Sequence, residues 1–189
     1  ILAGGKASRM GVDKAFIELE GSPLIKRQVK LLNTLFKRII IVTNSPSKFR
    51  FRNVKVIQDI IPNQGPLGGI YSGLKASSSF YNFVIACDMP NINLELIKYM
   101  YKNTVGYDAV IPKINNKYEP LFAIYSKKCL KYIKELLDKK TLKIRKLFPK
   151  IKLKAITRKE ILKFGLPERL FMNINAPEDL RQLNFWNEQ

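Results

Sequence analysis

The chain has 189 residues, of which 46% are hydrophobic and 26% are charged, and it contains no histidine. This composition is typical of a folded globular protein and excludes intrinsic disorder, and no apolar run reaches the length that crosses a bilayer. The absence of histidine excludes catalytic triads and metal sites that depend on imidazole. We expect one cytoplasmic domain over residues 1–189, with a few residues of the first strand preceding Ile1.

Short apolar strands alternate with helical patterns along the first half. The expected elements are, in order, a strand end at 1–3, a glycine- and charge-rich loop at 4–13, a helix from Leu24, strands at 38–43 and 54–58, a glycine-rich turn at 65–69 that opens a helix to residue 75, and a strand at 83–87. The run RIIIVT at 38–43 is apolar without interruption, which is typical of a parallel strand covered on both faces.

The second half continues the alternation. The expected elements are a helix at 94–101, strands at 108–112 and 121–125, a helix at 127–138, a short helix at 142–148, a strand at 153–156 and a closing helix from 177. Strands and helices that alternate in this way predict an α/β protein, namely a three-layer α/β/α sandwich around a mostly parallel sheet.

The formal net charge is +19, and 16 of the 34 Lys and Arg residues fall within 127–169, against four acidic residues there. Such a charge attracts polyanions, so a nucleic-acid-binding protein is one interpretation. The basic residues are mostly lysines without a stacking motif or a DNA-reading module. We therefore favour a compositional bias that steers anionic substrates, and we expect neither a specific nucleic acid nor a membrane as partner.

The loop at 4–13 carries the strongest chemical signal. Paired glycines after a strand let backbone N–H groups approach a phosphate, because no Cβ blocks them. Arg9 and Lys14 add a planar guanidinium fork and a mobile ammonium group. Together they are suited to a triphosphate and to the charge on departing pyrophosphate. The alternative is a tight turn with solvated charges.

Three further polar residues follow predicted strands. Asp88 comes directly after the apolar run FVIAC, so we expect it at the carboxyl edge of the sheet, where open α/β folds bind ligands. Mg²⁺ needs only one or two carboxylates besides substrate phosphates, which makes Asp88 a candidate metal ligand. The alternative is a cap on the following helix. Asn44 and Asp59 also follow strands, where turn capping is the alternative.

The string LAGGKASRMGVDK at 2–14 resembles the signature of the nucleotidyltransferases related to molybdenum cofactor guanylyltransferases. This resemblance implies a Rossmann-like nucleotidyltransferase fold and assigns catalysis to Arg9, Lys14 and Asp88, with Asp88 as the metal ligand. The nucleotide-binding residues that it implies are Leu2, Ala3, Gly4, Gly5, Lys14, Asn44, Asp59, Gly65 and Asp88.

Later segments match the same family in order. GPLGG at 65–69 resembles its substrate-binding turn, CDMP at 87–90 its metal-binding turn, and NINAPEDL at 173–180 its C-terminal motif, with Ala176 in place of the usual Thr. An extended strand would place Asn173 and Asn175 on one face. The acceptor-binding residues that the resemblance implies are Gly69, Glu119, Asn173 and Asn175.

The resemblance implies an enzyme that transfers GMP from GTP onto the terminal phosphate of molybdenum-molybdopterin, with Mg²⁺ or alternatively Mn²⁺ as cofactor. Its small-molecule partners would be GTP and the molybdopterin-type acceptor. Its protein partners would be other molybdenum cofactor biosynthesis proteins and the acceptor molybdoenzymes. A cytidylyltransferase or a sugar-phosphate nucleotidyltransferase is the alternative within the same class.

Overall fold

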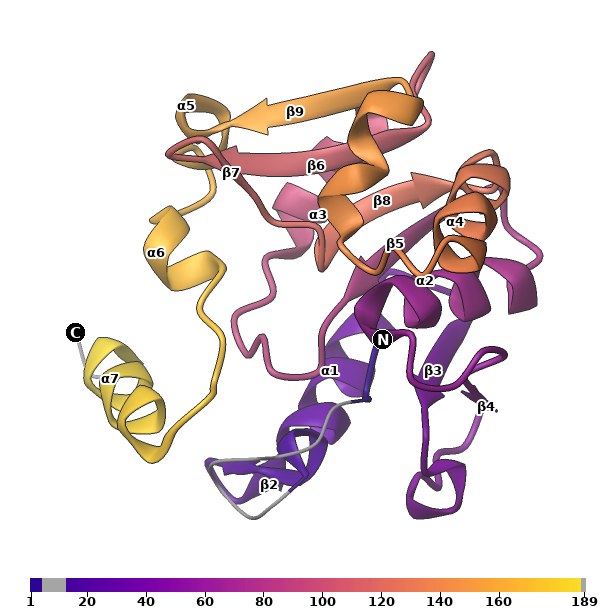
Figure 1. Ribbon diagram of the computed structural model, residues 1–189. Helices are drawn as coiled ribbons and strands as arrows, with labels where there is room; N and C mark the ends of the chain where they lie inside the picture. The colour runs from indigo at the N-terminus through magenta and orange to yellow at the C-terminus, as the bar shows by residue number, and fades with distance from the viewer. Residues whose placement is uncertain (5–12, 188–189) are drawn as a thin grey trace.

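The computed structural model describes residues 1–4 and 13–187, and a mixed sheet lies at its centre (Figure 1). In spatial order the sheet contains β4 (Val54–Gln58), β3 (Ile39–Thr43), the segment around Leu2, β5 (Tyr81–Ile85), β8 (Phe122–Ser126), β6 (Ala109–Ile114) and β9 (Leu153–Thr157). Only β8 pairs antiparallel with its two neighbours in this order, and β7 (Lys117–Tyr118) forms a hairpin with β6. The prediction of a mostly parallel sheet is confirmed.

Leu2 joins the two halves of this sheet. It forms parallel bridges to Val42, in β3, and to Ala86, just after β5. Its N–H donates to the Ile85 carbonyl at 2.8 Å, and its own carbonyl accepts from the Cys87 N–H at 3.0 Å. The segment that leads into the glycine-rich loop is therefore held at the middle of the sheet.

Helices cover both faces of the sheet, which confirms the three-layer prediction. On one face α1 (Leu24–Leu32), α3 (Leu94–Lys102) and α5 (Arg158–Ile161) share a buried cluster with the strands. On the other face α2 (Gly65–Ala76) and α4 (Cys129–Asp138) share a second cluster. Neighbouring residues of β6, Val110 and Ile111, belong to opposite clusters, because successive side chains of a strand alternate between its faces.

A third and smaller cluster lies at one side of the sandwich. It joins the hairpin of β1 (Glu18–Leu19) and β2 (Ser22–Pro23) to the C-terminal helix α7 (Pro177–Asn187). Its buried members are Ile17, Leu19, Leu24, Ile174 and Leu183. Residues 17–24 and 174–183 are thereby packed together, which the periodicity of the sequence did not predict.

Several boundaries differ from those expected. The strand expected at 83–87 begins and ends two residues earlier, because Ala86 already bonds to the Leu121 carbonyl and bridges Leu2. The turn expected at 65–69 is the first part of α2, and Gly65 starts that helix with φ +58°. The short helix expected at 142–148 is two 3₁₀ turns. The remaining short elements are η1 (Lys14–Phe16), η2 (Pro46–Lys48), η3 (Ile144–Lys146), η4 (Phe148–Lys150) and α6 (Pro167–Leu170).

Within 1–4 and 13–187, the helices are too short or too polar to cross a membrane.

Candidate active site

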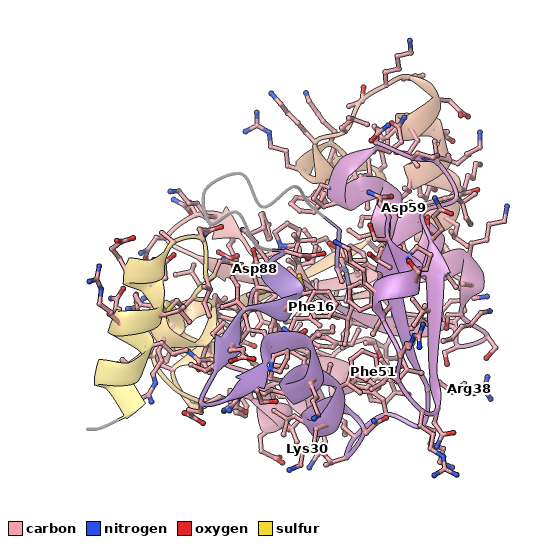
Figure 2. The ribbon with its side chains drawn as sticks, turned by 90° about the horizontal axis from the view of Figure 1, so that it is seen from below. Phe16, Lys30, Arg38, Phe51, Asp59 and Asp88 are labelled. Carbon is pink, nitrogen blue, oxygen red and sulfur yellow. The ribbon has the colours of Figure 1, made fainter. Side chains whose placement is uncertain are left out.

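The predicted site residues gather where the parallel strands end. Asn44 follows β3, Asp59 follows β4 and Asp88 lies three residues after β5. Because these strands are parallel, their carboxyl ends meet at one edge of the sheet. In Figure 2, Asp59 and Asp88 lie away from Arg38, which precedes β3 at the opposite edge.

Glu119 reaches the same edge by a different route. β8 runs against its neighbours, so the residues before it lie beside the carboxyl end of β5, where the Ala86 N–H donates to the Leu121 carbonyl at 3.0 Å. Glu119 is half-buried, and this burial raises the pKa of its carboxyl group, while Lys117 acts in the opposite direction. An antiparallel strand in the sheet is thus what brings Glu119 to this edge.

Asp88 sits on a turn that other segments hold in place. Its backbone carbonyl accepts from the Ile174 N–H at 2.8 Å, and the preceding Cys87 N–H bonds to Leu2. The side chain is 16% exposed, and its Oδ1 is buried with no hydrogen-bond partner within the described residues. A buried carboxylate oxygen without a donor is suited to a cation or a ligand donor.

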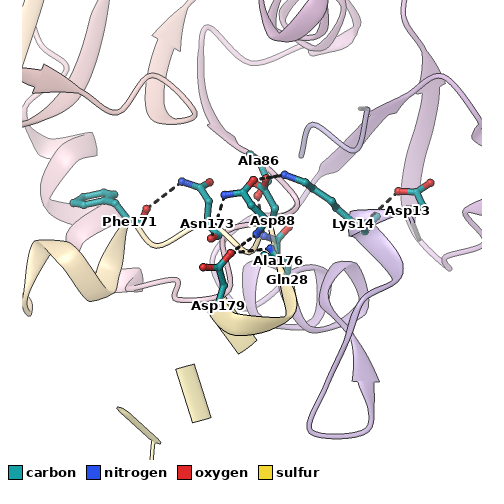
Figure 3. A network of polar contacts seen from close by, with 11 residues as sticks. Asp13, Lys14, Gln28, Ala86, Asp88, Phe171, Asn173, Ala176 and Asp179 are labelled. Carbon is teal, nitrogen blue, oxygen red and sulfur yellow. Dashed lines mark hydrogen bonds and ion pairs between the residues drawn. The ribbon is translucent and has the colours of Figure 1, made fainter. Parts of the chain in front are cut away.

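Lys14 supplies the positive charge beside this carboxylate. Its Nζ lies 2.9 Å from Asp88 Oδ2 and 2.5 Å from Asn175 Oδ1 (Figure 3). The preceding Asp13 caps η1, because its Oδ1 accepts from the Ala15 N–H at 3.3 Å. The structure thus brings together three predicted residues from the beginning, the middle and the end of the chain.

The segment of Asn173 and Asn175 belongs to no sheet within the described residues. The Ile174 N–H between them donates to the Asp88 carbonyl. Asp179 orders the entrance to α7, since its Oδ2 accepts from the N–H groups of Asn175 at 2.7 Å and Ala176 at 2.9 Å. These bonds hold the N–H groups just before α7, whereas a Thr hydroxyl at position 176 would accept from N–H groups inside the first turn.

The nucleotide-binding candidates form a neighbouring group. A Cβ atom on Gly4 would lie 3.8 Å from Asn44 Nδ2, so the end of the first strand contacts Asn44. Turn capping here is done by Thr43, whose Oγ1 accepts from the Ser45 N–H at 3.2 Å. Asn44 itself is exposed and is available to a ligand.

Asp59 lies beside α2 at the same edge. Its Oδ1 is buried without a hydrogen-bond partner among residues 1–4 and 13–187, and burial raises the pKa of its carboxyl group. The following N–H, of Ile60, is capped by Ser72 Oγ at 2.9 Å. A Cβ on Gly69 would lie 3.2 Å from a Leu2 methyl carbon and 3.8 Å from Asp59 Oδ1, so only glycine lets α2 pack this closely.

Other predicted residues are placed as follows. Leu2 and Ala3 are held within the sheet, whereas Gly65 is exposed at the start of α2. Gly5 and Arg9 lie outside the described residues. The pKa of the Cys87 thiol, beside Asp88, is raised to about 12 by burial and by the negative charge of Asp88, which keeps this thiol neutral.

A cavity of about 450 Å³ opens beside the amino-terminal parts of β3 and β5, and its lining also includes Leu2 and Gly69. Its walls include Arg38, Ser78 and Asn82. We assign the chemistry to the other edge, because Lys14, Asp88 and the unpartnered carboxylate oxygens lie there.

Sequence reasoning missed two polar residues that organise this edge. Asp179 gave a signal, because an acidic residue in the first turn of a helix commonly caps the residues before it. Gln28 also gave one, because it is a polar residue within the apolar face of α1, which includes Leu24 and Leu32.

Comparisons with known proteins show relatives over almost the whole chain. The sequence profile of the MobA-like NTP transferase domain matches residues 1–154. A probable molybdenum cofactor guanylyltransferase of Natranaerobius thermophilus is 38% identical over 188 residues, which are 96% of this chain and 92% of the relative. The molybdenum cofactor guanylyltransferase of Syntrophotalea carbinolica is 35% identical over 191 residues, covering 100% of this chain and 90% of that protein.

A solved structure has the same overall arrangement. The molybdopterin-guanine dinucleotide biosynthesis protein A of Archaeoglobus fulgidus superposes with a TM-score of 0.85 and 25% identity, over 100% of this chain and 97% of that one. With the family profile, the relatives and the fold in agreement, the chain belongs to the MobA-like NTP transferase domain family, a family of nucleotidyltransferases.

Proposed function

We propose that the protein transfers GMP from GTP onto the terminal phosphate of molybdenum-molybdopterin and releases pyrophosphate. The observation that carries the proposal is the meeting of Lys14, Asp88 and Asn175 at the carboxyl edge of the sheet. The names of relatives that are 35% and 38% identical over almost the whole chain support the choice of donor and acceptor.

The reaction is an in-line substitution at phosphorus. An oxygen of the acceptor phosphate attacks the α-phosphorus of GTP, a new P–O bond forms, and the bond to the departing pyrophosphate breaks. An ionised phosphate is already a nucleophile, so the step needs no general base, in agreement with a sequence without histidine. The protein then contributes positioning and compensation of negative charge.

Asp88 is suited to hold Mg²⁺, with Mn²⁺ as the alternative. Its Oδ1 has no partner among the described residues, and among them no three Asp, Glu, Cys or His side chains are grouped so that they could hold a metal ion. A single carboxylate fits an ion whose other ligands are phosphate oxygens and water. When bound, this ion would neutralise charge on the phosphates as a Lewis acid.

Lys14 is proposed to change partners when GTP binds. Its ammonium nitrogen lies 2.9 Å from Asp88 Oδ2 and so faces the negative charge of this carboxylate. Phosphate oxygens near this edge offer Lys14 a stronger concentration of negative charge, which would leave Asp88 available to the metal ion. Arg9 is proposed to bind the same phosphates.

The surrounding residues divide into two groups. We assign the nucleoside side to Asn44 and Asp59, because a carboxylate can accept two N–H bonds from the edge of guanine. Leu2, Ala3, Gly4, Gly5 and Gly65 would supply backbone to the nucleotide. We assign the acceptor side to Gly69, Glu119, Asn173 and Asn175.

Product formation tests this proposal directly. The purified protein is incubated with Mg²⁺, molybdenum-molybdopterin and each of GTP, CTP, ATP and UTP, and pyrophosphate and the dinucleotide product are measured. We expect both products with GTP, and we expect pyrophosphate formation to require the acceptor. A preference for CTP would instead identify a cytidylyltransferase, and the absence of any nucleotide turnover would contradict the assignment.

A further inference from the structure

Gln28 occupies an unusual place in α1. It lies on the apolar face of this helix, next to Ile25 and Val29, and only 2% of the residue is exposed. Glutamine is seldom this deeply buried, because its amide must give up its hydrogen bonds to water. The position of Gln28 therefore calls for a partner inside the protein.

The partner is the turn that carries Asp88. The Gln28 Nε2 donates to the carbonyl of Ala86 at 3.0 Å and to that of Met89 at 2.8 Å, on either side of Cys87 and Asp88 (Figure 3). Two carbonyl acceptors determine which end of the amide faces the turn, because only the nitrogen can donate. One side chain of α1 thus spans the whole turn.

The other end of the amide is left without a partner. Gln28 Oε1 is buried and accepts no hydrogen bond from the described residues. An unsatisfied buried acceptor lowers stability, but an apolar side chain at this position would instead take the Gln28 donor away from the carbonyl groups of Ala86 and Met89. The two bonds to the Asp88 turn therefore give a specific reason for glutamine here, because they tie α1 to the backbone that carries Asp88.

Gln28 also connects this turn, through α1, with the 3₁₀ helix η1 that contains Lys14. The Asp88 turn is bonded to Leu2 on one side and to Ile174 on the other, but neither contact involves α1. Lys14 lies in η1, which packs against α1. The bonds from Gln28 therefore connect the carboxylate of Asp88 with the part of the chain that carries its cation.

We propose that Gln28 is a positioning residue that orients Asp88 toward the metal ion and the nucleotide phosphates. The inference rests on the proposed function, since it assumes that Asp88 holds the metal. Residues that hydrogen-bond behind a metal ligand fix its direction, and their loss commonly weakens metal affinity about 10- to 100-fold. Gln28 would act in this way through the backbone of the turn.

The test compares Gln28→Met with Val29→Ala. Methionine keeps the length and the burial but donates no hydrogen bond, while Val29→Ala perturbs the same helix and leaves both Gln28 hydrogen bonds to the turn in place. GTP binding is measured by calorimetry over a series of Mg²⁺ concentrations and without Mg²⁺. For Gln28→Met we expect unchanged affinity without Mg²⁺ and a Mg²⁺ requirement raised about 10- to 100-fold. For Val29→Ala we expect a lower unfolding temperature and a wild-type Mg²⁺ requirement.

Gln28→Asn is the second variant, because its shorter amide cannot span both carbonyl groups, and we expect the same direction of change. A folded Gln28 variant with the wild-type Mg²⁺ requirement would overturn the inference and leave Gln28 a purely structural residue. If GTP binding to the wild-type protein did not depend on Mg²⁺, the metal role of Asp88 itself would be overturned, and this inference with it.

Discussion

At the scale of single residues, the ion pair of Lys14 and Asp88 is the central feature. Their side chains are 28% and 16% exposed, so neither charge is fully solvated. A carboxylate placed this far from water needs a counter-charge, and removing one partner leaves the other uncompensated. The pair therefore places a cation directly beside the carboxylate that we assign to the metal ion.

The first prediction concerns Asp88→Asn. The amide is nearly the same size, so we expect an unchanged fold, but it is a poor Mg²⁺ ligand, and turnover should fall roughly 100- to 1,000-fold, as for other groups that stabilise transition-state charge. Steady-state turnover and thermal unfolding check this. Asp138→Asn is the control, because Asp138 forms only an exposed pair with Lys134. Full activity of Asp88→Asn would remove Asp88 from the metal site.

The second prediction concerns Asp59→Asn. Burial raises the pKa of Asp59, so the folded protein binds this proton more tightly than the unfolded chain does. Ionised Asp59 therefore destabilises the fold at neutral pH, and its contribution to stability improves as the pH falls through the raised pKa toward the usual value of about 3.9. The variant should unfold at a higher temperature at pH 7, with a gain that shrinks in acid.

The same variant should bind GTP more weakly, because an amide presents an N–H₂ group where guanine needs a second acceptor. Calorimetric unfolding at several pH values and GTP titration measure the two effects. Glu95→Gln, at an exposed pair with Lys98, is the control and should change neither quantity much. A variant that is less stable at neutral pH, with wild-type GTP affinity, would contradict both parts.

At the scale of elements, the site depends on how the chain enters α7. The segment before this helix forms no ladder, and its N–H groups are held by Asp179 and by the Asp88 carbonyl. The small cluster of Ile174 and Leu183 with the hairpin residue Leu19 fixes the helix beside the beginning of the chain. Asn175 can contact Lys14 only because these separate supports coincide.

The third prediction is that Asp179→Ala loosens this entrance. Loss of a helix cap costs about 0.5–2 kcal/mol, and Asn175 would lose the bond that fixes its backbone. We expect a lower unfolding temperature and a higher KM for the acceptor, with a smaller change in KM for GTP. Glu178→Ala is the matched control, because Glu178 is paired only with the exposed Arg181. Equal effects of the two substitutions would contradict a capping role for Asp179.

At the scale of the whole molecule, the net charge of +19 is the dominant property. A strongly positive protein concentrates anions near its surface, and salt screens this attraction over about 8 Å at physiological ionic strength. Both proposed substrates carry anionic phosphate groups, so the positive electrostatic field attracts them regardless of which residues form the binding site. Exposed ion pairs such as Lys134–Asp138 neutralise some lysines locally, but the excess of positive charge over the whole molecule remains.

The fourth prediction is that association with GTP slows as salt rises. We expect the association rate constant to fall about tenfold between 20 and 500 mM KCl, while the dissociation rate changes much less, because steering acts on the encounter. Stopped-flow measurement with a fluorescent GTP analogue checks this. Nanomolar, salt-dependent binding of random duplex DNA without nucleotide turnover would instead favour the nucleic-acid interpretation.

Much of the fold could be predicted from local patterns. The apolar run of β3 and the helical spacing of α1 each follow from residues that are close in sequence, and both appear within a few residues of the expected bounds. The conformation of Asn173–Asn175 did not follow from local patterns, because alternation of side chains does not determine whether a neighbouring strand is present. The hairpin β1–β2 is too short for its two-residue strands to show a periodic pattern.

The sequence by itself determined the family, the alternation of strands and helices, and the kind of residue at each strand end, because these depend on residue types and short spacings. Only the tertiary structure decided that β8 runs antiparallel and brings Glu119 to the site edge, that Asn175 contacts Lys14, and that Gln28 spans the Asp88 turn. Those contacts join residues 58 to 161 positions apart. The physical reason is that such pairings depend on how whole layers pack, which no local spacing specifies.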